Sequence, residues 1–348
     1  MKNANFKLKM TTIVIGSGDA GFECVKKLKG TKGGVLWISK ERYMTKKWLM
    51  SKLVVKSGGI NGDKLIVDIP QYIEKNNMNV DFVIDEVKNI DTKKKDVAGK
   101  KKTYKYDKLI IATGSVPKMP CVEIADSDKI TTFDTYGDFI NAREKLKNAK
   151  KVAVVGAGPI GFELSLRLAS RHEVSLVEHD NDVLMQMLIN HPIYRHMVAK
   201  MLKLRGVKMH FSTQACSVRE GNLLCRTLRG EEFLVGCDVV IFAAGVRQNV
   251  PVIDGEDFGR DRVLFCDDFG EAFVHERGGK RKKLNDVYAI GDATCYLTKK
   301  NYPASAGFAE KSAKVAAFNA TYGNKKRIRY HPNIYYRFVD TILRRIIS

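Results

Sequence analysis

The sequence predicts an α/β protein with two parallel-sheet domains, because one strand–glycine–helix pattern occurs twice. The apolar run Thr11–Ile15 leads into the loop G-S-G-D-A-G at Gly16–Gly21. Lys151–Val155 leads in the same way into G-A-G-P-I-G at Gly156–Gly161. A strand–helix–strand unit with such a loop is typical of a doubly wound nucleotide-binding domain. The helix and second strand of each unit are predicted at Phe22–Leu28, Val35–Ile38, Phe162–Ser170 and Val174–Val177.

Composition excludes several other classes of protein. The chain has 348 residues, of which 44% are hydrophobic and 28% charged, which is typical of a globular protein with two or three cores. No apolar run approaches the roughly 20 residues that span a bilayer. The N-terminus lacks a signal-peptide core, and the seven cysteines form no C-x-x-C pair. We therefore expect a reducing, cytoplasmic setting without a disulfide scaffold or a metal site.

The rest of the chain contains both strand and helix patterns. A lysine-rich segment at 93–108 reads most simply as a solvated hairpin, and apolar residues recur at helical spacing over Ala304–Ala320. No low-complexity linker separates the parts, so closely packed domains are expected. Further strands are predicted at Val80–Ile84, Leu109–Ile111, Val207–Phe211, Leu223–Leu228, Val239–Ala243 and Val287–Ile290.

Each glycine of a G-x-G-x-x-G loop has a physical role in holding a dinucleotide. The first permits a tight turn, the second lets the backbone approach a pyrophosphate, and the third allows close helix–strand packing. Glu178 follows the second strand of the second unit, where its carboxylate can accept both ribose hydroxyls and repel a 2′-phosphate. This favours NADH over NADPH. The matching place in the first unit holds Ser39, Lys40 and Glu41, so the ribose carboxylate there is either Glu41 or absent.

Three further motifs occur in a fixed order with the two loops. They are Y-D-K-L-I-I-A-T-G at Tyr106–Gly114, A-A-G-V-R-Q-N at Ala243–Asn249, and Y-A-I-G-D at Tyr288–Asp292. With these motifs, the chain from about Thr12 to Gly323 resembles the FAD-dependent pyridine nucleotide-disulfide oxidoreductases. The resemblance implies two Rossmann-like domains, with FAD at the first loop and NAD at the second.

The resemblance also implies domain limits and site residues. The FAD domain would comprise 1–115 and 251–330, the inserted NAD(P) domain 116–250, and a basic amphipathic segment 331–348. The FAD-binding residues would be Gly16, Gly18, Ala20, Gly21, Glu41, Lys47, Lys52, Val87, Ala112, Thr113, Gly114, Gly291 and Asp292. The NAD-binding residues would be Gly156, Gly158, Pro159, Ile160, Gly161, Glu178 and Gly245.

A catalytic pair is implied by the segment Met44–Lys52, which is similar to the family pattern P-Y-x-R-P-x-L-S-K, with Lys47 in place of the arginine. In the family the final lysine, here Lys52, pairs with a glutamate two residues past the third glycine of the NAD loop, here Glu163. Such a pair beside flavin N5 would orient the nicotinamide. From the residues alone, Glu163 is a carboxylate near a helix N-terminus, which the helix dipole favours in any case.

The cysteines do not fit the thiol-dependent members of the family. Residues 39–60, where a reactive cysteine would lie beside the flavin, contain none, and Cys216 and Cys225 are too far apart for a C-x-x-C pair. Cys121 lies near the position of a reactive cysteine in sulfide–quinone oxidoreductases, but a second cysteine has no match, and we interpret Cys121 as structural. The electron acceptor is therefore expected to be something other than a thiol.

Charge suggests what that acceptor is. The net charge is +21, and residues 311–348 hold nine Lys or Arg against one acid, where relatives usually carry an interface domain. A basic surface would attract a small acidic iron–sulfur carrier such as rubredoxin or ferredoxin. One alternative is a membrane-associated NADH or sulfide quinone reductase whose basic tail lies on the inner membrane face. An alternative of another class is a basic flavoprotein that binds nucleic acid, although no recognisable nucleic-acid module is present.

Overall fold

The computed structural model describes residues 10–28, 31, 33–55, 64–184, 192–258, 262–276, 280–297, 306–323 and 327–329. The chain forms two compact units. The first unit comprises 1–46, 66–115 and 247–348, and the second comprises 47–65 and 116–246. The basic tail at 331–348, for which membrane contact is the alternative given above, lies outside the described residues.

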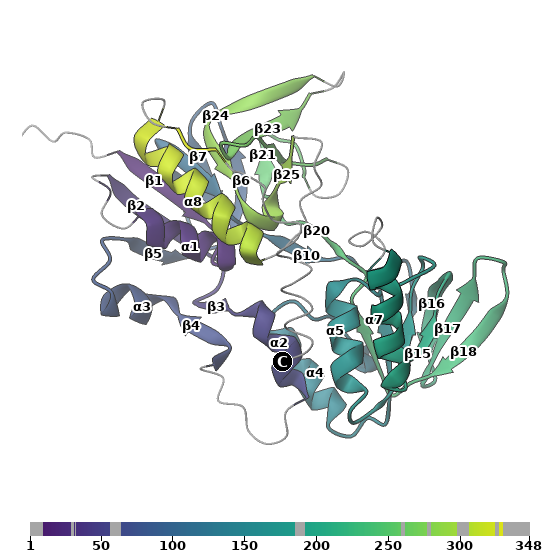
Figure 1. Ribbon diagram of the computed structural model, residues 1–348. Coiled ribbons are helices and arrows are strands. Elements are labelled where there is room, and N and C mark those ends of the chain that lie inside the picture. Colours follow the sequence, from purple (N-terminus) through teal and green to yellow (C-terminus); the bar gives the residue numbers. More distant parts are fainter. Residues whose placement is uncertain are drawn as a thin grey trace, which may run out of the picture. The chain divides into compact units, whose positions relative to one another are not determined.

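The first unit is built on an eight-stranded sheet with the order β25-β22-β23-β24-β9-β1-β2-β5 (Figure 1). The run β24-β9-β1-β2-β5 is parallel throughout, whereas β24 pairs antiparallel with β23. These strands are β1 (Thr11–Ile15), β2 (Gly34–Ser39), β5 (Asp81–Ile84), β9 (Lys108–Ile111), β22 (Phe265–Cys266), β23 (Glu271–His275), β24 (Arg281–Ala289) and β25 (Cys295–Tyr296).

Successive side chains of β1 are buried on opposite faces of this sheet. Val14 belongs to one core cluster, with residues of α1 (Asp19–Leu28) and α8 (Ala306–Tyr322). Ile13 and Ile15 belong to a second core cluster, with residues of a small sheet of order β21-β6-β7-β8. Successive strand side chains point to opposite faces, so the unit has three layers. The remaining elements are β3 (Tyr43–Thr45), β4 (Ile66–Asp68), α3 (Ile69–Lys75), β6 (Val87–Asp91), β7 (Asp96–Gly99), β8 (Thr103–Lys105), β21 (Val252–Ile253) and η3 (Gly291–Ala293).

The second unit pairs a parallel sheet of order β12-β19-β13-β14-β15 with a sheet of order β11-β16-β17-β18. Their facing side chains, among them Val155 and Leu223, form one core cluster. The strands are β11 (Glu123–Ile124), β12 (Ile130–Thr131), β13 (Lys151–Val155), β14 (Glu173–Val177), β15 (Lys208–His210), β16 (Thr213–Arg219), β17 (Asn222–Thr227), β18 (Glu232–Gly236) and β19 (Val239–Phe242). The helices are α2 (Lys47–Val54), η2 (Ser127–Lys129), α4 (Tyr136–Leu146), α5 (Pro159–Leu168) and α7 (Pro192–Leu204). The chain passes between the units at the two ends of 47–65, within β10 (Ser115–Pro117) and within β20 (Val246–Gln248).

The division differs from the predicted domain limits in two segments. Residues 247–250, expected in the second domain, belong to the first unit. Residues 47–65, expected in the first domain, belong to the second unit. The physical reason is burial, since Met50, Ser51, Leu53 and Val54 of α2 are buried and α2 packs on α4 and α5. Arg143 of α4 also donates a hydrogen bond of 2.9 Å to the carbonyl oxygen of Leu53.

The lysine-rich hairpin is held by ion pairs rather than only by solvent. Asp286 of β24 pairs with Lys95 at 2.6 Å and with Lys108, and Lys105 pairs with Asp96 at 2.6 Å. Neutralising acids therefore stand beside several of these lysines. In the part of the chain that the structure describes, no helix is long and apolar enough to cross a membrane.

Candidate dinucleotide-binding sites

The first glycine loop joins β1 to α1, and two of its glycines are required by the protein itself. Gly16 has φ +106°, and its amide donates 2.8 Å to the carbonyl of Ile38. A Cβ at Gly16 would overlap the carbonyl oxygen of Ala112, and one at Gly21 would overlap that of Gly16. Both positions therefore exclude any side chain. Ala20, the remaining predicted loop residue here, is buried in the first turn of α1.

Gly18 is different, because nothing in the protein requires it to be a glycine. A Cβ there would meet no atom within 4 Å, and its backbone is not left-handed. The space above Gly18 is open, next to the N-terminal amides of α1, where a phosphate is favoured. A loop closed by two obligatory glycines and open above the middle one fits the pyrophosphate of a dinucleotide.

Two further turns of the first unit meet at this loop. Gly291 follows β24, and its Cβ would lie 2.8 Å from the Cβ of Ala20, so the turn at Asp292 lies against the start of α1. Asp292 accepts a 3.2 Å hydrogen bond from the hydroxyl of Ser115. The amide of Gly291 donates 3.1 Å to Ser312 Oγ of α8, a support that the sequence motifs did not include. A serine among the apolar residues of α8 is the signal that could have indicated it.

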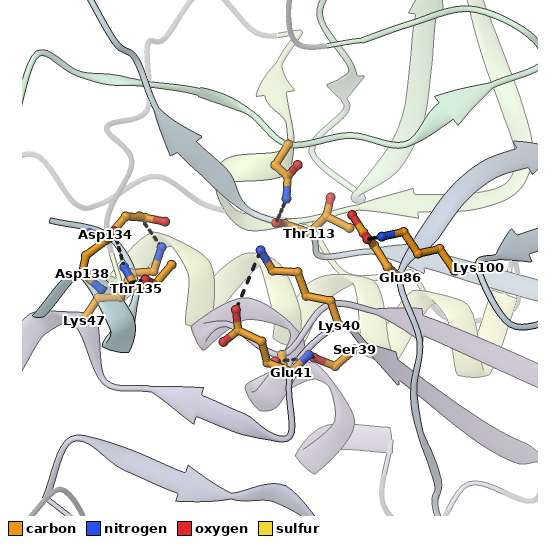
Figure 2. A network of polar contacts seen from close by, with 12 residues as sticks. Ser39, Lys40, Glu41, Lys47, Glu86, Lys100, Thr113, Asp134, Thr135 and Asp138 are labelled. Atoms are coloured by element: carbon orange, nitrogen blue, oxygen red, sulfur yellow. Dashed lines mark hydrogen bonds and ion pairs between the residues drawn. The ribbon is translucent and has the colours of Figure 1, made fainter. Parts of the chain in front are cut away.

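The A-T-G turn after β9 carries an unsatisfied polar atom. Ala112 donates 2.9 Å to Ile15, and Gly114, with φ +70°, accepts 3.0 Å from the amide of Asn249. The side-chain amide of Asn249 donates 3.3 Å to the carbonyl of Thr113 (Figure 2). Thr113 Oγ1 is buried without a hydrogen-bond partner. Buried polar atoms are normally satisfied, so this hydroxyl fits contact with a bound group such as FAD.

The second loop repeats the geometry of the first. Gly156 has φ +104°, and Cβ atoms at Gly156 and Gly161 would overlap the carbonyl oxygens of Ala243 and Gly156. A Cβ at Gly158 would meet nothing within 4 Å, and Pro159 begins α5. The two loops are therefore equivalent in backbone and in the open space above the middle glycine.

Three further residues predicted for the two sites lie on different elements. Ile160 is 43% exposed on the first turn of α5. Gly245 has φ +92°, with open space where a Cβ would stand. Val87 is half-buried at the start of β6 and packs against the core of the first unit.

Glu178 lies at the second loop. Its carboxylate accepts hydrogen bonds from the amide of Ala157, inside the loop, and from that of Asp180 at 3.0 Å. Its own amide donates 2.9 Å to His210. Both hydrogen bonds to the carboxylate come from backbone amides, which leave its negative charge in place. The carboxylate oxygens keep further lone pairs that can accept hydrogen bonds from ribose hydroxyls.

Strand register shows what occupies the same place in the first unit. Val155, before Gly156, pairs with Val177, and Ile15, before Gly16, pairs with Ile38. Glu178 therefore corresponds to Ser39. Ser39 Oγ lies 2.7 Å from the hydroxyl of Ser17 and accepts 3.1 Å from the amide of Glu41, a pairing that the sequence did not indicate.

Glu41, the predicted ribose carboxylate of the FAD site, lies two residues further along the chain than the position that matches Glu178. Its side chain is 45% exposed and lies 3.8 Å from the ammonium of Lys40 (Figure 2). The carboxylate of Glu41 therefore lies in the bend after β2, beyond the position that matches Glu178.

The predicted FAD ligands Lys47 and Lys52 belong to the second unit, on α2. Lys47 forms a 2.5 Å ion pair with Asp134, as Figure 2 shows. Glu163, on α5, pairs with Arg167 one turn along the helix at 3.2 Å. In the described residues no ion pair within 4.0 Å joins Lys52 to Glu163, although α2 packs on α5.

The cysteines offer no activated pair. All seven are free, and burial raises the pKa of the thiols of Cys225 and Cys266 to about 12. Cys121 is exposed. No group of three or more His, Cys, Asp or Glu among the described residues could hold a metal ion.

Known proteins share this arrangement. Residues 10–313 match the family model of the pyridine nucleotide-disulphide oxidoreductases. An NADH-rubredoxin oxidoreductase of Clostridium acetobutylicum is 24% identical over 90% of this chain and 75% of its own length. An NADH oxidase of Methanocaldococcus jannaschii is 29% identical over 81% of this chain and 63% of its own. A ferredoxin reductase from Rhodopseudomonas palustris superposes with a TM-score of 0.75 at 20% identity, covering 92% of this chain and 78% of its own.

These matches span most of the chain, although the chain spans only part of each relative. They confirm the predicted α/β fold with two dinucleotide-binding units. The chain therefore belongs to the pyridine nucleotide-disulphide oxidoreductase family and is an oxidoreductase that uses FAD and NAD(P)H.

Proposed function

We propose that the protein oxidises NADH at the second glycine loop and passes the electrons, through FAD at the first, to an acceptor that is not a thiol. The observation that carries this proposal is the carboxylate of Glu178, held at the loop by the amides of Ala157 and Asp180. A fixed negative charge at that place accepts the two ribose hydroxyls of NADH and repels the 2′-phosphate of NADPH.

The residues of the first unit would hold FAD. The amides at the start of α1 face the open space above Gly18 and would carry the pyrophosphate. Asp292 would accept a ribityl hydroxyl, and Thr113 Oγ1 gains the partner that it lacks. Bound FAD supplies the exchange between two-electron and one-electron chemistry, because it takes up a hydride and can release its electrons singly.

Lys52 and Glu163 are proposed to orient the nicotinamide. Support comes from the packing of α2 on α5 within one unit. Lys52→Ala is expected to slow reduction of the flavin by NADH at least about tenfold while the NADH dissociation constant stays unchanged. Stopped-flow reduction without air measures this rate. Equal rates in the variant and the unaltered protein would remove Lys52 from the mechanism.

The proposed acceptor is a small acidic iron–sulfur protein such as rubredoxin or ferredoxin. The net charge of +21 would steer an acidic carrier, and relatives of this chain are named for such partners. Because residues 39–60 contain no cysteine, electrons would leave the flavin without a thiol intermediate.

The test is an NADH titration of the purified protein in the absence of air, followed by addition of acceptor. We expect NADH to bleach the flavin band, NADPH to bleach it poorly, and reduced protein to reoxidise rapidly with rubredoxin or ferredoxin. A colourless protein that FAD cannot reconstitute refutes the proposal. Faster reoxidation by a quinone, lost when residues 330–348 are deleted, would instead support the quinone reductase alternative.

A further inference from the structure

Helix α7 of the second unit leaves three large apolar side chains uncovered. Val198 and Leu202 are buried on its inner side, where α7 packs on α5 (Figure 1). Ile193, Met197 and Leu204 are 74%, 50% and 77% exposed. At 3.6 residues per turn these three side chains share one face of the helix with Lys200, and we call this the α7 face. Large apolar side chains gathered on one exposed face make it a candidate interaction surface.

The segment that carries the α7 face is rich in cations and contains no acid. Residues 192–208 contain five Lys or Arg and no Asp or Glu. Two of the five lie near acids, Arg195 at 3.8 Å from Asp182 and Lys208 at 3.9 Å from Glu173. The exposed Lys200, Lys203 and Arg205 have no ion-pair partner within 4.0 Å among the described residues.

This combination restricts what can cover the face. A second copy of α7 would bring Lys200, Lys203 and Arg205 against their own equivalents, and like charges repel. The basic segment 331–348, with Arg337, Arg344 and Arg345, has the same sign of charge. The occupant must therefore be anionic and accept apolar side chains at once.

A lipid surface with anionic headgroups meets both requirements. We propose that α7 docks the second unit on an anionic membrane surface, with the helix in the plane of the headgroups. Ile193, Met197 and Leu204 would enter the acyl boundary, while Lys200, Lys203 and Arg205 would contact lipid phosphates. This docking is independent of the electron acceptor, because it involves no group assigned to FAD, NADH or catalysis.

Vesicle flotation of the full-length protein tests the proposal. Vesicles of phosphatidylcholine with one quarter phosphatidylglycerol are compared with vesicles of phosphatidylcholine alone. We expect binding to the anionic vesicles only, weakened by raised salt. Met197→Glu and Leu204→Glu should each lower the partition coefficient about tenfold, because a carboxylate replaces a membrane-inserted apolar group.

Leu234→Glu on β18 is the matched control. Leu234 is 61% exposed in the same unit but lies outside α7, so this variant should bind vesicles like the unaltered protein. Unchanged unfolding temperatures and flavin spectra establish that the variants are folded. No binding to anionic vesicles, binding unaffected by the α7 substitutions, or equal loss in Leu234→Glu would each overturn the proposal. Vesicle binding that disappears only on deletion of 330–348 would assign it to the tail, and capture of an acidic protein without vesicle binding would also refute it.

Discussion

Replacing Gly158 of the second glycine loop by alanine should change the affinity for NADH without changing the stability of the fold. Gly158 has φ −67° and ψ −176°, which alanine adopts freely, and its Cβ would meet no atom within 4 Å. Gly158→Ala should therefore change the free energy of unfolding by less than about 0.5 kcal/mol. The methyl would stand where the pyrophosphate approaches, and overpacking of about 1–3 kcal/mol predicts an NADH dissociation constant raised about 5- to 150-fold.

Gly161→Ala is the opposite case. Its Cβ would overlap the carbonyl oxygen of Gly156, which is backbone and cannot turn away. The loop must shift, and a loss of about 3 kcal/mol or more in the free energy of unfolding is expected.

Urea unfolding without nucleotide and calorimetric NADH titration measure the two effects separately. Equal NADH affinity of Gly158→Ala and the unaltered protein would refute a pyrophosphate above Gly158. Equal losses of stability in Gly158→Ala and Gly161→Ala would refute the different roles of the two glycines.

Three further predictions concern single carboxylates. Glu178→Gln should weaken NADH binding by about 2 kcal/mol and reduce discrimination against NADPH, as calorimetry with both nucleotides would show; an unchanged NADH affinity would exclude Glu178 from the ribose site. Ser39→Glu places a carboxylate at the matching position of the first unit and should tighten FAD binding severalfold, measured by flavin fluorescence on dilution; equal or weaker retention would contradict the equivalence of the two positions. Asp85 is buried, which by itself raises the pKa of its carboxyl, but hydrogen bonds from Tyr104 and from the amides of Lys101 and Glu86 outweigh burial and lower that pKa. Its stabilising effect is thus complete above a pH of about 4 and lost as the pH falls toward the folded-state pKa, so Asp85→Asn should cost about 1–3 kcal/mol at neutral pH and less in acid. A constant difference down to pH 2 in urea unfolding would refute this.

Several features were predictable from the sequence because their causes are local. A β-branched strand, a glycine that must adopt positive φ, and a helix that starts at once occupy a few consecutive residues, as at Gly16 and Gly156. The strands β1, β13 and β19 and the helix α8 consequently lie close to where apolar periodicity placed them. The equivalence of the two loops follows from the same local rules.

Features that depend on distant partners were decided only by the tertiary structure. From its position along the chain, the segment 47–65 was expected in the first domain. A helix of eight residues packs with the core that buries its apolar side chains. In the structure α2 packs on α4 and α5, so the segment belongs to the second unit. Glu163 has a partner one turn away in Arg167, and that local ion pair forms rather than the distant pair with Lys52.

The sequence by itself thus determined the two nucleotide loops, the order of the family motifs and the carboxylate after the second strand. The tertiary structure decided that Ser39 and not Glu41 matches Glu178, because only strand register aligns the two units residue by residue. It also decided which face of α7 is exposed, since amphipathic spacing shows that a helix has faces but not which neighbour covers each of them.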